Sequence, residues 1–332
     1  MATMHDVARV AGVSTTTVSH VLNGTRRVNS ETRSRVEDAI EQTGYRTNHL
    51  ARSLASGRTR TVGLCISAMT NPYFGNLAHS IELNLSAAGY TMVLGDGHDD
   101  VDVEQEAVRF LLGYRVDGLL LAPTRDSGTT TIPQVAATGT PLVLIDRFLD
   151  IECDQVASEG FRPAYEITEH LIERGHRRIT VLTGVGSASS TQERLDGFTA
   201  ALEAHQIELD PRLVADGASN MDVAHQALLR VLDLEDRPTA LVTLNNSMTI
   251  GAMMALRDRG LRVPDDLALV CFDDFEWADL FRPRLTAVAQ DIEEMSRSAV
   301  ELLLSRIENP DQEARQIRVG TQLQHRNSCG CH

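Results

Sequence analysis

The stretch STTTVSHVLNG, residues 14–24, gathers hydroxyl, imidazole and amide side chains that can hydrogen-bond to another molecule. At 100° per residue, Val18, Val21 and Leu22 share one face of a helix, and polar side chains occupy the opposite face. Short hydroxyls can donate or accept at base edges in a DNA major groove, and threonine methyls can contact thymine. No acidic residue interrupts this polar face. The candidate DNA-contacting residues are Ser14, Thr15, Thr16, Thr17, Ser19, His20, Asn23 and Arg26.

A second set of chemistry-bearing residues follows apolar runs in the rest of the chain. Carboxylates, an amide, an arginine and aromatic rings stand where buried strands are expected to end. Aromatic faces combined with carboxylates and a bidentate guanidinium suit a polyhydroxylated ligand such as a sugar. Taken singly, each residue could equally be a helix cap or part of a surface ion pair. The candidates are Asn71, Tyr73, Phe74, Asp146, Arg147, Asp273, Asp274 and Trp277.

Motifs of catalysis and of metal binding are weak or missing. GVGS at 184–187 lacks the third glycine of a dinucleotide loop, and no G-x-S-x-G, Walker or H-E-x-x-H motif occurs. Cys329, Cys331 and His332 are metal-ligand types without a second ligand pair, which favours a frayed end over a metal site. We therefore expect no catalytic residue, no cofactor and no metal.

Three short helices are predicted around the polar face. Thr3 and Asp6 form a capping-box pattern before a helix that ends at Gly12, and Ser14 can cap the next helix. A third helix begins at Ser30 and stops at Gly44. Their spacing is that of a helix-turn-helix, whose second helix enters the major groove. A three-helix bundle that binds protein is the alternative.

Residues 48–57, NHLARSLASG, carry a narrow apolar stripe that includes Ala51 and Leu54. A helix this short is marginal in isolation, so we expect it to fold only against a partner. Leu54 could then wedge into a minor-groove base step, with Ala51 beside it. The alternative is a helical linker whose Leu54 packs on its own protein.

From residue 61 onward, apolar runs alternate with helical patterns. Strands are predicted at 62–67, 91–96, 118–122 and 142–146, and again at 178–184, 213–217, 240–244 and 267–274. Helices fit near 76–88, 104–113 and 131–138. Two consecutive α/β halves predict two lobes of parallel sheet with a cleft at the carboxyl ends of the strands.

The charge is divided unevenly along the chain. Residues 1–60 carry nine arginines and five acidic residues, a net +4, whereas the remainder carries −19, giving −15 overall. Only the head is therefore expected to approach a polyanion. Five scattered cysteines, the lack of an 18-residue apolar run and the lack of a signal-peptide pattern predict a cytoplasmic protein with no membrane partner.

The motifs MATMHDVARVAGVSTTTVSHVLN, SETRSRVEDAIEQTGY and NHLARSLASG resemble those of the LacI/GalR family of bacterial repressors, with the head most similar to the purine-responsive members. The resemblance implies three parts: a helix-turn-helix domain at 1–47, a hinge helix and linker at 48–60, and a two-lobed core at 61–332 like type I periplasmic binding proteins. It also implies that Thr15, Thr16 and His20 read bases, that Arg26 supports them and that Leu54 is the wedge.

In the core, the resemblance assigns effector contacts to Arg194 of QERLDGF, to Asn245 and to Asp273. Two departures bear on the ligand. The family's Asp-Asn-x-x-Gly is replaced by Glu159-Gly160-Phe161-Arg162-Pro163, and its Asn-Asp pair is Asn245-Asn246. Ligand identity therefore cannot be copied from a relative.

The leading hypothesis is a repressor of sugar uptake or catabolism genes, with a sugar or sugar derivative as effector. It would act as a homodimer on double-stranded palindromic operator DNA, because one recognition helix reads only a few base pairs. A purine- or nucleoside-responsive repressor is the first alternative. A small-molecule-processing enzyme on the same fold and a solute-binding protein of a transporter are the others.

Overall fold

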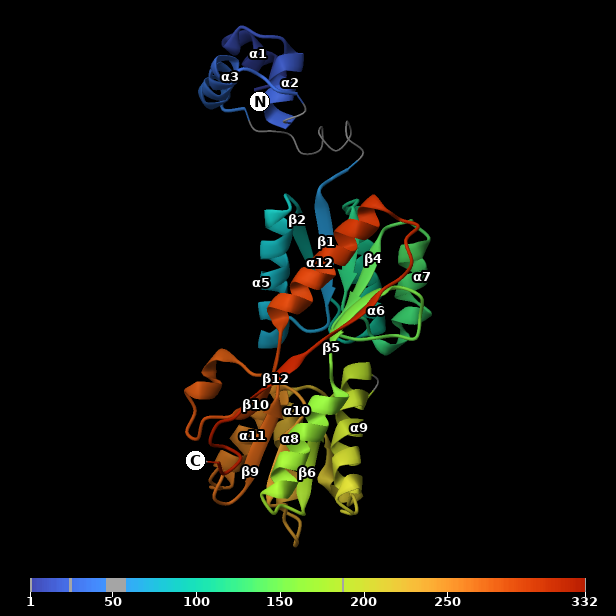
Figure 1. The fold of residues 1–332 in the computed structure, drawn as a ribbon, viewed down its shortest axis with the longest axis vertical. Helices are drawn as coiled ribbons and strands as arrows, with labels where there is room; N and C mark the ends of the chain where they lie inside the picture. The colour runs from blue at the N-terminus through green and yellow to red at the C-terminus, as the bar shows by residue number, and fades with distance from the viewer. Residues whose placement is uncertain (1, 24–25, 46–57, 187, 332) are drawn as a thin grey trace. The chain divides into compact units, whose positions relative to one another are not determined.

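The computed structural model describes residues 2–23, 26–45, 58–186 and 188–331, and it divides into two units between Thr59 and Arg60. The segment 46–57, with the predicted hinge residues Ala51 and Leu54, lies outside the described residues. Figure 1 shows the fold.

The described residues of the first unit form three helices, α1 (Met4–Ala11), α2 (Thr15–Asn23) and α3 (Ser30–Thr43). The capping box forms: the Thr3 hydroxyl accepts from the Asp6 amide, and the Asp6 carboxylate accepts from the Thr3 amide. Gly12, at φ 65°, ends α1 in the left-handed conformation that glycine adopts without strain. Apolar side chains from all three helices, Val7 and Val18 and Val36 among them, form the core of this unit.

The second unit contains two lobes, each built on a six-stranded sheet. The first sheet has the order β11-β5-β4-β3-β1-β2. Its strands are β1 (Thr61–Ile66), β2 (Thr91–Asp96), β3 (Gly118–Leu121), β4 (Leu142–Ile145), β5 (Asp154–Ser158) and β11 (Gln316–Val319). Its helices are α5 (Pro72–Ala87), α6 (Val101–Gly113), α7 (Thr131–Ala136) and α12 (Ile292–Glu308).

The second sheet repeats this arrangement in the order β12-β10-β9-β8-β6-β7. Its strands are β6 (Ile179–Thr183), β7 (Val214–Asp216), β8 (Ala240–Thr243), β9 (Ala268–Phe272), β10 (Thr286–Gln290) and β12 (Thr321–Gln324). Its helices are α8 (Phe161–Glu173), α9 (Ser189–Ala204), α10 (Met221–Leu232) and α11 (Asn246–Asp258). Both sheets are parallel except that β12 runs antiparallel to β10. The predicted α/β fold of two parallel-sheet lobes is confirmed.

The prediction that the two halves are consecutive is wrong. After β10 the chain returns to the first lobe, where α12 packs against α5 and the sheet, and β11 adds the edge strand before β12 ends the second lobe (Figure 1). Met295, Leu302 and Leu303 of α12 are buried in the first lobe's core. The buried Asp154 of β5 holds Arg306 of α12 at 2.9 Å. The chain therefore crosses between the lobes three times.

The end of the chain also differs from the prediction of a frayed terminus. The Ser328 carbonyl accepts from the Leu269 amide at 2.8 Å, and the Ser328 hydroxyl donates to the Leu269 carbonyl at 2.6 Å. Cys329 is buried in the core of the second lobe. Pairing with strand β9 thus holds this segment in place. Among the described residues, no helix is long and apolar enough to cross a membrane.

Candidate functional site

A pocket with a volume of about 690 Å³ lies where the carboxyl ends of strands from both lobes face each other. Its lining includes nine residues that the sequence nominated: Asn71, Tyr73, Phe74, Asp146, Arg147, Arg194, Asn245, Asp273 and Trp277. Asp274, a tenth candidate, does not line it, because its carboxylate is paired with Arg326 at 2.8 Å. Nominated residues at the strand ends of both lobes thus line one shared pocket.

Two aspartates occupy equivalent places in the two lobes. Asp146 follows β4 and Asp273 follows β9, and each of these strands is third from the corresponding edge of its sheet. Both residues adopt positive φ, 70° and 71°, a backbone region that is sparsely populated by residues other than glycine. Strain of this kind concentrates where surrounding structure must hold a side chain in one direction. Here it brings one buried carboxylate from each lobe to the same pocket.

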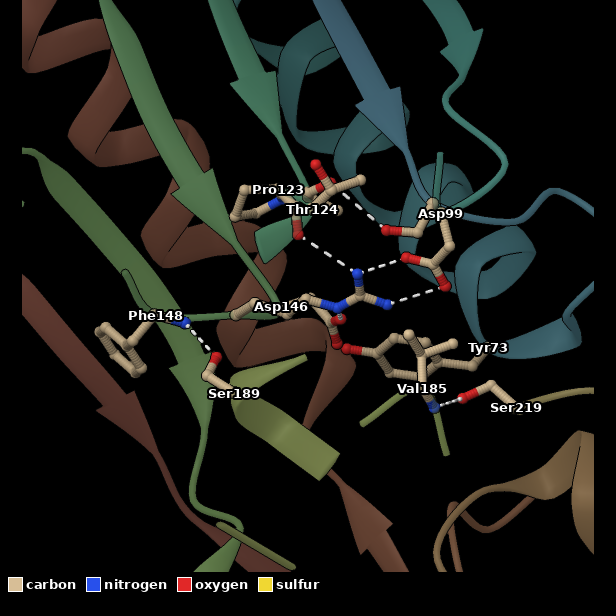
Figure 2. Close-up of polar contacts among 12 residues, drawn as sticks. Tyr73, Asp99, Pro123, Thr124, Asp146, Phe148, Val185, Ser189 and Ser219 are labelled. Carbon is tan, nitrogen blue, oxygen red and sulfur yellow. Dashed lines mark hydrogen bonds and ion pairs between the residues drawn. The ribbon is translucent and has the colours of Figure 1, made fainter. Parts of the chain in front are cut away.

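Arg147 anchors the first lobe's side of the pocket, and Figure 2 labels its partners Asp99 and Pro123. Its Nη1 donates to Asp99 Oδ1 and, at 3.2 Å, to the Pro123 carbonyl, while its Nη2 donates to Asp99 Oδ2 at 3.2 Å. Burial lowers the pKa of Arg147, but the neighbouring Asp99 and Asp146 outweigh it and the net shift is upward. The guanidinium is therefore a fixed positive charge that is already paired within the protein.

Burial raises the pKa of Asp146, against the opposing effects of Arg147 and of the hydrogen bond from Tyr73. Burial, followed by the nearby Asp146 charge, raises the pKa of Tyr73 as well. The Tyr73 hydroxyl is thus neutral and able to donate. The Tyr73 and Phe74 rings contact edge to face, with centroids 5.1 Å apart.

Arg194 anchors the second lobe's side. Its Nη1 donates to the Leu244 carbonyl at 2.6 Å and lies 3.8 Å from Asp273 Oδ1, and its guanidinium lies 3.7 Å above the centre of the Phe272 ring. Asp273 Oδ1 also accepts from Gln290 Nε2 at 2.6 Å. The buried Arg194 Nε has no hydrogen-bond partner among the described residues. These contacts fix both side chains before any ligand arrives.

The two asparagines act as helix caps as well as lining the pocket. Asn71 Oδ1 accepts from the Tyr73 amide at 2.9 Å, and Asn245 Oδ1 accepts from the Met248 amide at 2.8 Å. With Pro72 in its first turn, the Asn71 cap starts α5 four residues earlier than predicted, so Tyr73 and Phe74 lie on a helix and not in a loop. Trp277 remains 47% exposed.

Several further residues line the pocket that the sequence pattern did not nominate. They include Asp96, His98, Asp99, Thr191, Ser219, Asn220, Asp222 and Gln290. Asp96 ends β2 and Asp99 follows it, so the strand-end rule could have found both. Gln290 ends β10, a strand that the sequence pattern did not reveal. With these additions the lining holds five aspartates and two arginines.

Two contacts join the lobes beside the pocket. Arg318 of β11 pairs with Glu193 of α9 through both guanidinium amines, at 2.7 and 2.8 Å, and lies over the Phe148 ring. The Phe148 amide donates to the Ser189 hydroxyl at 3.1 Å (Figure 2). The lobes are therefore in direct contact at the side of the pocket.

In the first unit, α2 carries the predicted DNA-contacting residues. Ser14, Thr15 and Thr16 are exposed, whereas Ser19 and His20 are half-buried. The Ser14 hydroxyl accepts from the Thr17 amide at 3.1 Å and contacts the Thr17 hydroxyl at 2.9 Å, so Ser14 also caps the helix. Arg26 is exposed just beyond α2. Asn23 ends the helix.

Residues 3–48 match the family of bacterial regulatory proteins of the lacI type, and residues 168–329 match a periplasmic binding protein-like domain. The transcriptional repressor PurR of Aliivibrio salmonicida is 34% identical over 330 residues, which is 99% of each chain. The chain belongs to the LacI family. PurR of Haemophilus influenzae strain PittEE is also 34% identical to this LacI-family protein, over 95% of this chain and 94% of the relative.

Solved structures agree over the full length of this LacI-family chain. The lac repressor dimer bound to operator and the anti-inducer ONPF has a TM-score of 0.88 at 28% identity, with 99% of both chains covered. The transcriptional regulator CelR in complex with cellobiose has a TM-score of 0.75 at 32% identity, with 99% of this chain and 100% of the other covered. The protein is a DNA-binding transcriptional repressor, and the enzyme alternative is excluded.

Proposed function

We propose that this LacI-family repressor controls sugar uptake or catabolism genes and that its effector is a neutral polyhydroxylated compound, a sugar or sugar derivative, bound between the lobes. The observation that carries the proposal is the charge of the pocket. Five aspartates line it, and the positive charge of Arg147 is already matched by Asp99. Carboxylates accept hydrogen bonds from ligand hydroxyls, whereas they repel a phosphorylated ligand.

The remaining lining fits the same ligand class. Aromatic rings of Tyr73, Phe74 and Trp277 offer faces to the apolar side of a sugar ring, and the buried Arg194 Nε offers a donor. A volume of about 690 Å³ is in the range of ordinary small-molecule sites. The relative solved with cellobiose, at 32% identity, supports a sugar ligand by analogy.

A purine or nucleoside effector is the second candidate, since the curated relatives at 34% identity are purine repressors by name. Carboxylates can accept from the ring N–H groups of a purine, and aromatic rings can stack on it. The two candidates differ in how many hydroxyl groups they present. A sugar presents several hydroxyls, and the carboxylates of the five lining aspartates can accept hydrogen bonds from them.

On the DNA side, we propose that Thr15, Thr16 and His20 read bases in a major groove, with Arg26 supporting them. Two chains would bind a palindromic operator as a homodimer. Ligand binding would change the separation of the two cores and so shift the folding of hinge helices that carry Ala51 and Leu54. The lac repressor dimer bound to operator supports this arrangement by analogy.

The test is a ligand panel read by calorimetry and by the fluorescence of Trp277, the chain's single tryptophan. The panel holds neutral mono- and disaccharides, their phosphates, and purine bases and nucleosides. We expect saturable binding of a neutral sugar, and weaker binding of its phosphate. Binding of purines alone would replace the sugar proposal, and preference for a sugar phosphate would overturn the inference from pocket charge.

A further inference from the structure

The last residues of the chain bring two cysteines beside a histidine of the second lobe. Cys329 is buried in the core of the second lobe, and the Thr286 hydroxyl of β10 donates to its sulfur at 3.2 Å. Gly330 adopts φ 83°, and its carbonyl accepts from Arg174 Nη2 at 2.7 Å. This turn brings Cys331 next to α8, where its sulfur lies 3.4 Å from His170 Nε2.

The ligand atoms of His170, Cys329 and Cys331 all lie within 4.8 Å of one another. Zinc bonds of about 2.3 Å to sulfur and about 2.0–2.1 Å to nitrogen, at tetrahedral angles, set these two ligand types about 3.6 Å apart. The observed separation of 3.4 Å between Cys331 and His170 is close to that value. A metal could therefore enter with small side-chain movements.

We propose that His170, Cys329 and Cys331 form a binding site for a thiophilic divalent cation of the Zn²⁺ class. Two thiolates and one imidazole are the donor set that zinc prefers, and solvent completes a four-coordinate shell. His325, whose ring contacts that of His170 edge to face at 5.0 Å, packs against the imidazole ligand. The site is separate from the effector pocket, whose lining includes none of these residues.

The surroundings allow a metal to reach the site and to stay. Cys331 and His170 are half-buried, which leaves an entry path, while Cys329 is 1% exposed. Among the described residues, this is the one cluster of three or more metal-ligand types with this spacing. Bound metal would join the chain's end to α8, two segments that are 161 residues apart in sequence.

The experiment uses the full-length protein, stripped of metal with a chelator and kept reduced. Zn²⁺ is titrated in competition with a chromophoric chelator, and Co²⁺ is used to report thiolate ligation by its charge-transfer absorption. We expect one ion per chain and a rise in Tm with Zn²⁺. Cys331→Ser and His170→Ala should each weaken Zn²⁺ binding by at least about 10-fold and remove the thiolate absorption or shift it.

Cys153→Ser is the matched control, because Cys153 is a half-buried cysteine of the first lobe, whereas the cluster lies in the second lobe. It should leave Zn²⁺ affinity unchanged. Operator binding by each variant verifies that the variant folds. Cys331→Ser is preferred to a substitution at Cys329, because Cys329 is buried in the core and changing it would disturb folding. The proposal would be overturned if wild type, Cys331→Ser and His170→Ala bound Zn²⁺ with equal affinity. It would also be overturned if Cys153→Ser lost as much Zn²⁺ affinity as the two ligand variants.

Discussion

Asp273 and Asp274 are adjacent in the sequence, yet their carboxylates have different partners. Asp273 lines the pocket and contacts Gln290 and Arg194, whereas Asp274 is paired with Arg326 outside it. Asp273→Asn should weaken effector affinity about 10-fold or more, because a hydrogen bond to a charged group contributes about 1.5–3 kcal/mol. Asp274→Asn is the matched control and should leave affinity unchanged. Calorimetry with the effector tests both, and equal losses would mean that the pocket is misassigned.

Asp146 predicts a pH dependence of stability. Burial raises its pKa in the folded protein, so the folded state takes up this proton at a higher pH than the unfolded chain does. Above the raised pKa, Asp146 is charged in the folded protein, and burying this charge lowers the free energy of unfolding. As pH falls through the raised pKa, the carboxylate becomes protonated and this destabilisation disappears. The stability of the ligand-free wild type relative to Asp146→Asn should therefore increase as pH falls from neutral towards about 4. Urea denaturation across this range measures it, and a constant difference between the proteins would contradict the prediction.

At the scale of elements, the packing of α8 on α9 fixes where Arg194 lies. A Cβ at Gly197 of α9 would stand 2.1 Å from the Phe161 carbonyl oxygen of α8. Gly197→Ala should therefore push the helices apart, lower stability by about 1–3 kcal/mol and weaken effector affinity by moving Arg194. Gly113→Ala on α6, where an added Cβ would meet no atom within 4 Å, is the control and should leave effector affinity unchanged without loss of stability. Denaturation and ligand titration of the two variants measure both effects, and equal behaviour of the two would refute the packing explanation.

For the whole molecule, the basic head and the acidic remainder predict how DNA affinity responds to salt. The logarithm of operator affinity should fall steeply with the logarithm of salt concentration between about 50 and 200 mM, despite the net charge of −15. If Arg26 contacts a phosphate of the DNA backbone, Arg26→Ala removes that contact, and the magnitude of the slope should decrease by about one. Fluorescence anisotropy with a labelled operator measures the slope, and a flat dependence would rule out a DNA contact dominated by the basic head.

Leu54 gives a prediction that rests on sequence alone, since it lies outside the described residues. Leu54→Ala should weaken operator binding because it removes the proposed minor-groove wedge, while effector affinity stays unchanged. Operator titration and effector calorimetry on the same preparation test it. Unaltered operator affinity would exclude the wedge.

The sequence by itself determined the features that depend on residues close together in the chain. The helix-turn-helix follows from caps, glycines and apolar spacing within a short segment, and Asp146 and Asp273 were found because strand ends lie next to apolar runs. Tertiary structure alone decided the rest. The return of α12 and β11 to the first lobe, the pairing of Asp99 with Arg147, and the approach of His170 to Cys331 join residues far apart in the chain. Such contacts leave no periodic pattern in the sequence, because they depend on how complete sheets and helices pack and not on the neighbours of each residue.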